Sequence, residues 1–424
     1  MIPNRSARSL FACLLAFASR FARASITDSK SEASCPNDAD AVLVSPGTKL
    51  NENARFPFTL EGDWERVLVA PEIEIVPKSE TSFWTEGPIL RDDVLYVSDP
   101  VLALIYRITQ VDGKDNFEVW ATQSGGIEDP NETIAEPGSN GMATDSLDSD
   151  FVIINQQGLR RVVRCKLDQH EPGAPLSQCP GLEVITDSFS NDSGDRRYNS
   201  PNDVVVHRED GSIWFTDPIY GLLEKNRFCD EFSCSTGEAY LDAKSEIGWK
   251  GVYRVDRKNG NLVELFTKFH RRPNGLGFTP DGSKLWVADS TNGIPSWTAY
   301  NIPDKPWESC DATPKASNIV NSVSLGTWLG RTEDLPFLNG GEGLSDGFKF
   351  DEEGYLWTSI PNGFAVIDTV QQEVICQILL GTNTSNLAFG KNGQVWLTGL
   401  KGIWKIQRRI PSATVKSRSY YRQQ

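Results

Sequence analysis

One pattern of two short strands recurs six times between residues 86 and 398. In each copy the first strand opens with a carboxylate or carboxamide side chain, a tight polar turn follows, and the second strand carries a large aromatic residue. Residues 202–206, the turn Glu209-Asp210-Gly211 and residues 213–217 form one such copy. The six copies open at Glu86, Asn140, Asn202, Asn274, Asp346 and Asn386. A repeat of this kind restricts the chain to folds that are built from successive hairpins.

Where sequence remains between the copies, it supplies two further strands. Residues 251–256 and 262–266, which flank the turn Lys258-Asn259-Gly260, are one example. Four strands make one blade of a β-propeller, so we predict an all-β, six-bladed propeller. The last copy lacks a fourth strand, and a segment within residues 64–75 is expected to supply it and close the ring. A sandwich of two sheets is the alternative, because many short strands would also fit that fold.

The pattern divides the chain into four parts. We assign residues 1–24 to a signal peptide, 25–63 to an N-terminal extension, 64–408 to the propeller and 409–424 to a polar C-terminal tail. Residues 219–250 and 291–341 are longer than ordinary connections, so we predict lids or loops at the rim there. Trp297, Trp307 and Trp328 in the second segment would either form an apolar lid or anchor the loop to the core.

The first residues have the order of a signal peptide. Arg5 and Arg8 precede an apolar run at residues 10–18, and Ala22-Arg23-Ala24 stands before Ser25 as a cleavage motif. We therefore predict a secreted protein with a mature N-terminus near Ser25, although an N-terminal helix kept in the fold is the alternative. No later run of about 18 apolar residues could cross a membrane. Three acceptor sequons agree with export, at Asn131, Asn191 and Asn383.

Seven cysteines remain after residue 24, and an odd number leaves at least one without a partner in the chain. Short separations favour two bridges, Cys165 with Cys179 and Cys229 with Cys234. The absence of a Cys-x-x-Cys pair argues against a zinc ribbon or a redox site.

The chain is acidic, with 42 Lys and Arg residues against 57 Asp and Glu residues and a formal net charge of −15. This charge repels phosphate backbones and anionic lipid headgroups, so nucleic acid and membrane surfaces are not expected partners. An acidic surface is also ordinary for a soluble extracellular protein. Oligomeric state cannot be read from these features.

The six opening residues predict a metal site. The first strand of each propeller blade is innermost, so its opening residue points into the central channel. Six oxygen-bearing side chains, two of them carboxylates, then converge on one axis, where they need a cation between them. Six to eight oxygen ligands in a flexible arrangement suit calcium, whereas zinc would want histidine or cysteine. Alternatively, the asparagines only cap strand ends or form turns.

Several segments resemble the signatures of the gluconolactonase and regucalcin family. They include Trp84-Thr85-Glu86-Gly87-Pro88, Asn199-Ser200-Pro201-Asn202-Asp203, Arg272-Pro273-Asn274-Gly275-Leu276, Asp346-Gly347-Phe348 and Thr384-Ser385-Asn386-Leu387. The resemblance implies a six-bladed propeller with a channel calcium held by Glu86, Asn202, Asn274 and Asp346. Related members include lactonases and phosphotriesterase-like hydrolases such as diisopropyl fluorophosphatase. Asn155-Gln156-Gln157 departs from the Glu-His pair of the bacterial gluconolactonases, which bears on the substrate and leaves the metal site intact.

A calcium-dependent lactone hydrolase is the function that these features favour. Calcium would polarise the carbonyl, and Asp346, which the resemblance places on the metal, is the candidate general base. Glu86 is predicted to be a plain ligand, and Asn202 to share its time between metal and substrate. Asn140, Asp203 and Asn386 complete the predicted substrate contacts.

Two other functions stay open, hydrolysis of phosphorus esters at the same metal and a propeller that binds a ligand without catalysis. A serine-histidine mechanism has little support, because there is no Gly-x-Ser-x-Gly motif. The available histidines are His170, His207 and His270, and the last two are expected to be surface or loop residues.

Overall fold

The structure is a computed structural model that describes residues 58–76, 84–127, 134–191, 194–223, 244–290, 296–302, 319–324, 345–360, 363–400 and 402–410. The predicted signal peptide lies outside the described residues. So do Asn131, Cys35, Cys229, Cys234, Cys310, Trp307 and Trp328.

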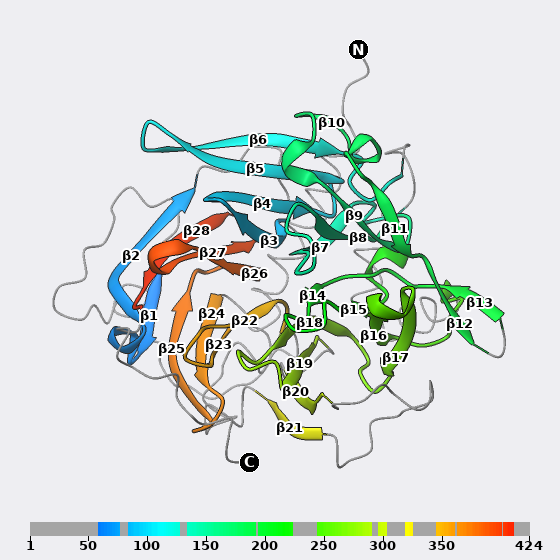
Figure 1. The fold of residues 1–424 in the computed structure, drawn as a ribbon. Helices are drawn as coiled ribbons and strands as arrows, with labels where there is room; N and C mark the ends of the chain where they lie inside the picture. The colour runs from blue at the N-terminus through cyan, green and yellow to red at the C-terminus, as the bar shows by residue number, and fades with distance from the viewer. Residues whose placement is uncertain are drawn as a thin grey trace, which may run out of the picture.

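Six sheets of four or five described strands lie around a common axis, with β3, β7, β14, β18, β22 and β26 innermost (Figure 1). A further two-stranded sheet is the hairpin of β12 (Ser188–Asn191) and β13 (Gly194–Arg197). The predicted six-bladed propeller is confirmed, and the sandwich is excluded. The first two blades contain β3 (Glu86–Arg91), β4 (Val94–Asp99), β5 (Leu104–Val111) and β6 (Lys114–Thr122), then β7 (Ser139–Thr144), β8 (Val152–Gln156), β9 (Arg161–Cys165) and β11 (Glu183–Thr186). The next two contain β14 (Val204–Val206), β15 (Ile213–Asp217), β16 (Gly251–Asp256) and β17 (Leu262–Thr267), then β18 (Pro273–Phe278), β19 (Lys284–Asp289), β20 (Ser296–Asn301) and β21 (Ile319–Ser324). The last two contain β22 (Phe348–Phe350), β23 (Tyr355–Ile360), β24 (Gly363–Asp368) and β25 (Glu373–Leu379), then β26 (Thr384–Phe389), β27 (Gln394–Gly399) and β28 (Ile403–Arg408).

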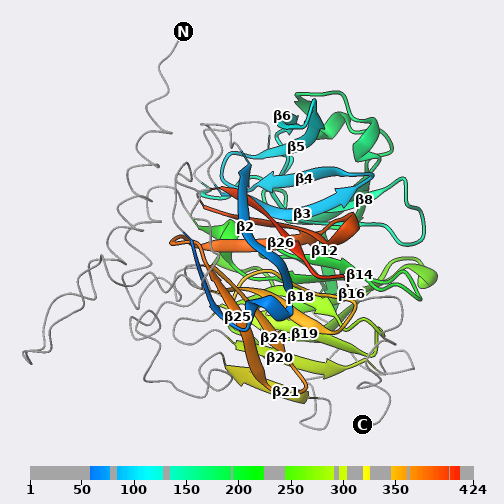
Figure 2. The ribbon, with the colours of Figure 1, turned by 90° about the vertical axis from the view of Figure 1, so that its left-hand side faces the viewer.

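The ring is closed by the N-terminal segment. Strand β2 (Leu68–Val76) pairs antiparallel with β28, with Ile73 opposite Ile406. This confirms the predicted closure by a strand from before Glu86, and both views place β2 on the outer side of the last blade (Figures 1 and 2). Strand β1 (Thr59–Gly62) pairs with β25 and adds a fifth strand to the preceding blade. The two N-terminal strands therefore tie the last two blades together.

The core is divided among the joins between the blades. Six clusters of buried side chains each contain residues from two adjacent blades. For example, Trp357 of the fifth blade and Trp404 of the sixth belong to one cluster, and both are almost completely buried. The large aromatic residues in the repeated second strands thus fill the spaces between blades, which is why the pattern needs them.

The second long segment is partly blade rather than loop. Within residues 291–341, β20 pairs with β19 and β21 pairs with β20, so these strands complete the fourth blade. The expectation of a rim loop is wrong for this part, because backbone hydrogen bonds of the blade extend into it. Trp297 lies on β20 and is fully buried, so this tryptophan anchors the segment to the core. In the first segment, residues 219–250, the described residues include a 3-10 turn at Tyr220–Leu222.

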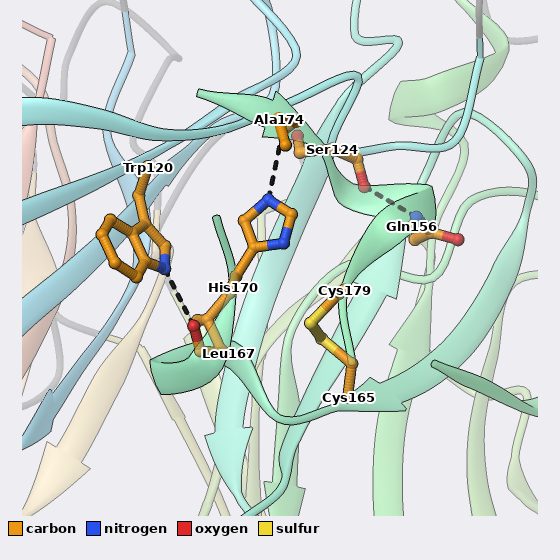
Figure 3. Close-up of a disulfide and its surroundings, with 8 residues drawn as sticks. All are labelled: Trp120, Ser124, Gln156, Cys165, Leu167, His170, Ala174 and Cys179. Carbon is orange, nitrogen blue, oxygen red and sulfur yellow. Dashed lines mark hydrogen bonds between the residues drawn. A yellow bond between two sulfur atoms is a disulfide. The ribbon is translucent and has the colours of Figure 1, made fainter. Parts of the chain in front are cut away.

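One disulfide joins Cys165 and Cys179 across 14 residues, as predicted (Figure 3). It closes a loop that contains β10 (Ala174–Pro175), which pairs with β6 of the first blade. The Trp120 indole donates a hydrogen bond to the Leu167 carbonyl at 2.9 Å and holds the same loop. Among the described cysteines, Cys376 is free and buried. No helix in the described part of the chain is both long enough and apolar enough to cross a membrane.

Candidate functional site

The six opening residues are buried where the innermost strands begin. Their exposed fractions range from 2 to 6 %, so all six side chains are buried although all are polar. These residues are Glu86, Asn140, Asn202, Asn274, Asp346 and Asn386. Polar side chains buried to this degree must be satisfied by partners, which makes their contacts informative.

The strand ladder is interrupted at every opening residue. The register shifts just after Glu86 in β3, and at the matching places in β7, β18 and β26. In the other two blades, β14 and β22 begin two residues after Asn202 and Asp346. Such irregularities change the direction of a side chain without ending the strand. The pattern therefore turns the opening side chains away from the regular alternation of the sheet.

Glycine follows four of the opening residues because neighbouring strands approach closely there. A Cβ on Gly87 would lie 2.2 Å from the Asn140 carbonyl oxygen, and one on Gly275 would lie 2.3 Å from that of Asp346. No side chain fits at such distances, so glycine lets adjacent blades meet near the axis. The third blade has Asp203 at this position, which adds a third carboxylate to the site.

Side chains from one blade hold the opening segment of the next. Ser98 Oγ donates to the Asn140 carbonyl at 2.7 Å, and Thr216 Oγ1 donates to the Asn274 carbonyl at 2.7 Å. Asn155 Nδ2 donates to the carbonyls of both Asn202 and Asp203. Asn155, which departs from the gluconolactonase pattern, therefore positions the opening segment of the third blade in this chain.

Three carboxyl groups lie close enough to influence one another. Glu86 Oε1 accepts a hydrogen bond from Trp84 Nε1 at 3.0 Å, and Oε2 accepts one from the Gly87 amide. Burial raises the pKa of Glu86 to about 8, and the charge of Asp203 adds to this shift. Burial, Glu86 and Asp203 together raise the pKa of Asp346 well above its usual range. Each shift reports the cost of negative charge in this place when no cation is present.

Asn274 supplies an oxygen that the protein leaves without a partner. Its Nδ2 donates to Ser290 Oγ at 3.0 Å, which fixes the orientation of the amide. Its Oδ1 is buried and lacks a hydrogen-bond partner among the described residues. An unpaired amide oxygen beside clustered carboxyl groups fits a hard cation with oxygen ligands. The described residues contain no group of three histidine, cysteine or acidic side chains arranged as a metal site, so such a cation would also depend on amide oxygens.

Asn386 differs from Asn274, because both ends of its amide are engaged. Oδ1 accepts hydrogen bonds from Lys349 Nζ at 3.2 Å and from the Leu387 amide at 2.9 Å. Nδ2 donates to Asp203 Oδ2 at 3.4 Å. The structure thus brings Asp203 and Asn386 together, although 183 residues separate them. Lys349 was missed by sequence reasoning, since one lysine within a strand carries no signal of its own.

A second polar group lies beside the ring. Gln157 is fully buried; its side chain interacts with the Glu136 carboxyl, whereas its amide oxygen has no hydrogen-bond partner in the described structure. Burial raises the pKa of the neighbouring Glu136 carboxyl to about 7, and the charge of Asp99 adds to this shift. Glu136 also contributes to the raised pKa of Asp346. Burial raises the pKa of Tyr220, and the charge of Asp346 adds to this shift. Gln157 stood in the divergent segment and Tyr220 in a segment that resembles the family, but nothing in the sequence marked Glu136.

The histidines have structural partners. His207 Nδ1 lies 3.0 Å from Asp210 and His170 Nε2 lies 3.1 Å from the Ala174 carbonyl. His270 lies in the loop before β18, but it is buried rather than exposed, and it bonds to Tyr300 and Asp289. These partners are carboxylates, a carbonyl and a tyrosine, so they give a serine-histidine mechanism no support.

Comparison with known proteins agrees with the fold. A gluconolactonase from Zymomonas mobilis is 28 % identical over 318 residues, which cover 73 % of this chain and 74 % of that protein. The lactonohydrolase oryL from Aspergillus oryzae is 25 % identical over 237 residues, which cover 54 % of this chain and 50 % of that protein. A solved gluconolactonase from Xanthomonas campestris has the same fold, with a TM-score of 0.58, 23 % identity and coverage of 82 % and 92 % of the two chains. Residues 84–399 match the family model described as the SMP-30/gluconolactonase/LRE-like region. The chain therefore belongs to the SMP-30/gluconolactonase/LRE-like family.

Proposed function

We propose that this chain is a secreted, calcium-dependent hydrolase that opens the ring of a lactone. The observation that carries the proposal is the buried cluster of Glu86 and Asp346 carboxyl groups beside the unpaired Asn274 oxygen. The reaction class is supported by the relatives, which are named gluconolactonase and lactonohydrolase.

Glu86, Asn202, Asn274 and Asp346 would hold the ion. All four donors are oxygens, and two are amides, which suits calcium better than zinc. When bound, calcium polarises a substrate carbonyl and stabilises the negative charge that develops on its oxygen. Because the ion would also offset the repulsion among the carboxylates, binding should displace the protons that their raised pKa values favour.

The protein's own groups divide the remaining work. Both oxygens of Glu86 accept hydrogen bonds from fixed donors, Trp84 Nε1 and the Gly87 amide, which suits a rigid ligand. Asp346 is held through its backbone amide, which donates to Ser359 Oγ at 2.9 Å. We assign Asp346 the role of general base, accepting a proton from the water that attacks the carbonyl carbon.

The surroundings favour a polar lactone, such as an aldonolactone or pantolactone, over an aliphatic one. Buried polar atoms without partners cost free energy unless a ligand satisfies them, and the Gln157 amide oxygen has no hydrogen-bond partner in the described structure. Asn140, Asn202, Asp203 and Asn386 stay proposed substrate contacts. For Asn386, the engaged amide oxygen argues for an indirect role through Asp203.

A substrate screen tests the activity. Purified protein is assayed in a pH-stat against aldonolactones, pantolactone, aliphatic lactones and aryl phosphotriesters, each with calcium and with chelator. We expect lactone hydrolysis that chelator abolishes and added calcium restores. Hydrolysis of the phosphotriesters alone, or binding of lactones without turnover, would show a different function for the same propeller.

Two isosteric variants separate the two carboxylate roles. Glu86→Gln weakens the ion site but keeps the base, so saturating calcium should restore much of its activity. Asp346→Asn keeps an oxygen ligand and removes the base, so we expect a loss of about 10² to 10⁴-fold that calcium does not rescue. If both variants respond alike to calcium, Asp346 is only a ligand, and Asp203 or a substrate-held water becomes the base to test.

A further inference from the structure

Lys349 brings a positive charge to one side of the carboxylate ring. It lies in the middle of β22, whose preceding residue Phe348 is fully buried in the core between the fourth and fifth blades. Because side chains alternate along a strand, Lys349 points away from that core. Its ammonium group donates to Asn386 Oδ1 on β26 at 3.2 Å, and the side chain is half-buried.

The contact depends on a glycine. A Cβ on Gly347 would lie 2.1 Å from Asn386 Cγ, so the Asn386 amide occupies the space above Gly347. From there it reaches both Lys349 on its oxygen side and Asp203 on its nitrogen side. Lys349, Asn386 and Asp203 therefore form one chain of hydrogen bonds that crosses from the fifth blade to the third.

The charges of this arrangement can be counted. Glu86, Asp203 and Asp346 would contribute three negative charges when ionised, and Lys349 contributes one positive charge, which leaves 3 − 1 = 2 to be balanced. Glu136 precedes β7 and is not one of the strand-opening residues, so it is not counted among these three carboxylates, although its charge also acts on Asp346. A buried site is most stable when its charge is compensated, so the ring and its lysine match a divalent cation.

We propose that Lys349 is an internal counter-charge which, through Asn386 and Asp203, sets the preference of this site for divalent over trivalent cations. The inference rests on the proposed calcium site and goes beyond it, because it assigns ion selectivity to a residue that need not touch the ion. Lys349 is a positioning and specificity residue here, not a catalytic one.

Ion binding can be read without any substrate. Trp84 Nε1 lies 3.0 Å from Glu86 Oε1, so Trp84 should sensitise the luminescence of terbium bound beside Glu86. Titration of the full chain with Tb³⁺, and displacement of Tb³⁺ by Ca²⁺, gives both affinities. Two variants remove the charge, Lys349→Met and Lys349→Gln, and the second keeps an N–H donor for Asn386. Lys349→Arg keeps the charge and is the matched control.

Removing the positive charge should strengthen cation binding, and more so for the more highly charged ion, because Coulomb energy scales with ionic charge. We expect both neutral variants to bind Ca²⁺ about tenfold more tightly, and the ratio of Tb³⁺ to Ca²⁺ affinity to rise about tenfold further. Lys349→Arg should leave that ratio within about twofold of the parent. In chelator, the neutral variants should unfold at a lower temperature than Lys349→Arg, and saturating calcium should reduce the difference.

Each contrary result has its own meaning. An unchanged selectivity ratio in a folded Lys349→Gln variant, or weaker binding of both ions, would overturn the counter-charge and leave Lys349 a structural role. If the parent chain binds neither ion, the proposed calcium site itself fails, and this inference fails with it. Should Lys349→Met not fold, Lys349→Gln still decides between these outcomes.

Discussion

Gly275→Ala tests the close approach that places Asp346 at the axis. The new Cβ would lie 2.3 Å from the Asp346 carbonyl oxygen and 2.8 Å from Gly347 Cα. Ordinary contact begins at 3.4 Å, so the two strands must separate by about 3.4 − 2.3 = 1.1 Å. Both opposing atoms belong to the main chain, so no side chain can rotate away. Gly275 does not have a positive φ, so alanine adds contact without backbone strain.

A displacement of this size is large for the proposed site. Calcium–oxygen distances span only about 2.3 to 2.6 Å, so a ligand that moves by about 1 Å is lost or must be replaced by water. We expect calcium affinity to fall at least about tenfold and kcat/KM for the best lactone to fall about 100-fold. Calcium binding is measured by isothermal titration calorimetry, and hydrolysis in the pH-stat.

Gly402→Ala is the matched control, because its new Cβ would meet only the edge of the Trp404 ring, at 3.3 Å. It should keep both calcium affinity and activity. Circular dichroism and thermal unfolding establish that both variants are folded. A folded Gly275→Ala protein with unchanged calcium affinity would refute the reasoning, since Asp346 would then either not bind the ion or not depend on this approach.

Three further predictions concern stability and export. The double variant Cys165→Ala/Cys179→Ala removes a disulfide across 14 residues, so the free energy of unfolding should fall by about 3 kcal/mol. Dithiothreitol should destabilise the parent but not the variant, and an equal effect on both would contradict the disulfide. Burial raises the pKa of Asp217 to about 7, above the value near 4 of an unfolded aspartate. Protonation of Asp217 therefore stabilises the fold, and this contribution to the free energy of unfolding is lost as pH rises from about 4 to about 7. Urea unfolding across that range at constant calcium should therefore show a shallower loss for Asp217→Asn than for the parent, and parallel curves would count against it. Material secreted by its native host should begin near Ser25 and carry a glycan on at least one of Asn131, Asn191 and Asn383. Peptide mapping that finds Met1, or no glycan, would overturn the secretion proposal.

Local patterns in the sequence were sufficient for the architecture. The alternation of short strands and turns predicted the hairpins, and the positions of Glu86, Asn140, Asn202, Asn274, Asp346 and Asn386 in that pattern predicted which side chains are buried at the innermost strands. The missing strand of the last copy pointed to β2 for the same reason. Each of these features repeats within a few residues, so one sequence suffices to detect it.

The tertiary structure alone decided how the polar groups share their hydrogen bonds. The hydrogen bond of the Asn274 nitrogen to Ser290 leaves the Asn274 oxygen without a partner. The oxygen of Asn386, by contrast, accepts hydrogen bonds from Lys349 and Leu387, although the two asparagines open equivalent strands. The strands within residues 291–341 were likewise invisible, because the pairing of β20 with β19 and of β21 with β20 is set by the blade and not by a local turn signal. Such differences arise from contacts between residues far apart in the chain, including the 183 residues between Asp203 and Asn386. A local pattern carries no record of these contacts, because they exist only once the ring of blades has closed.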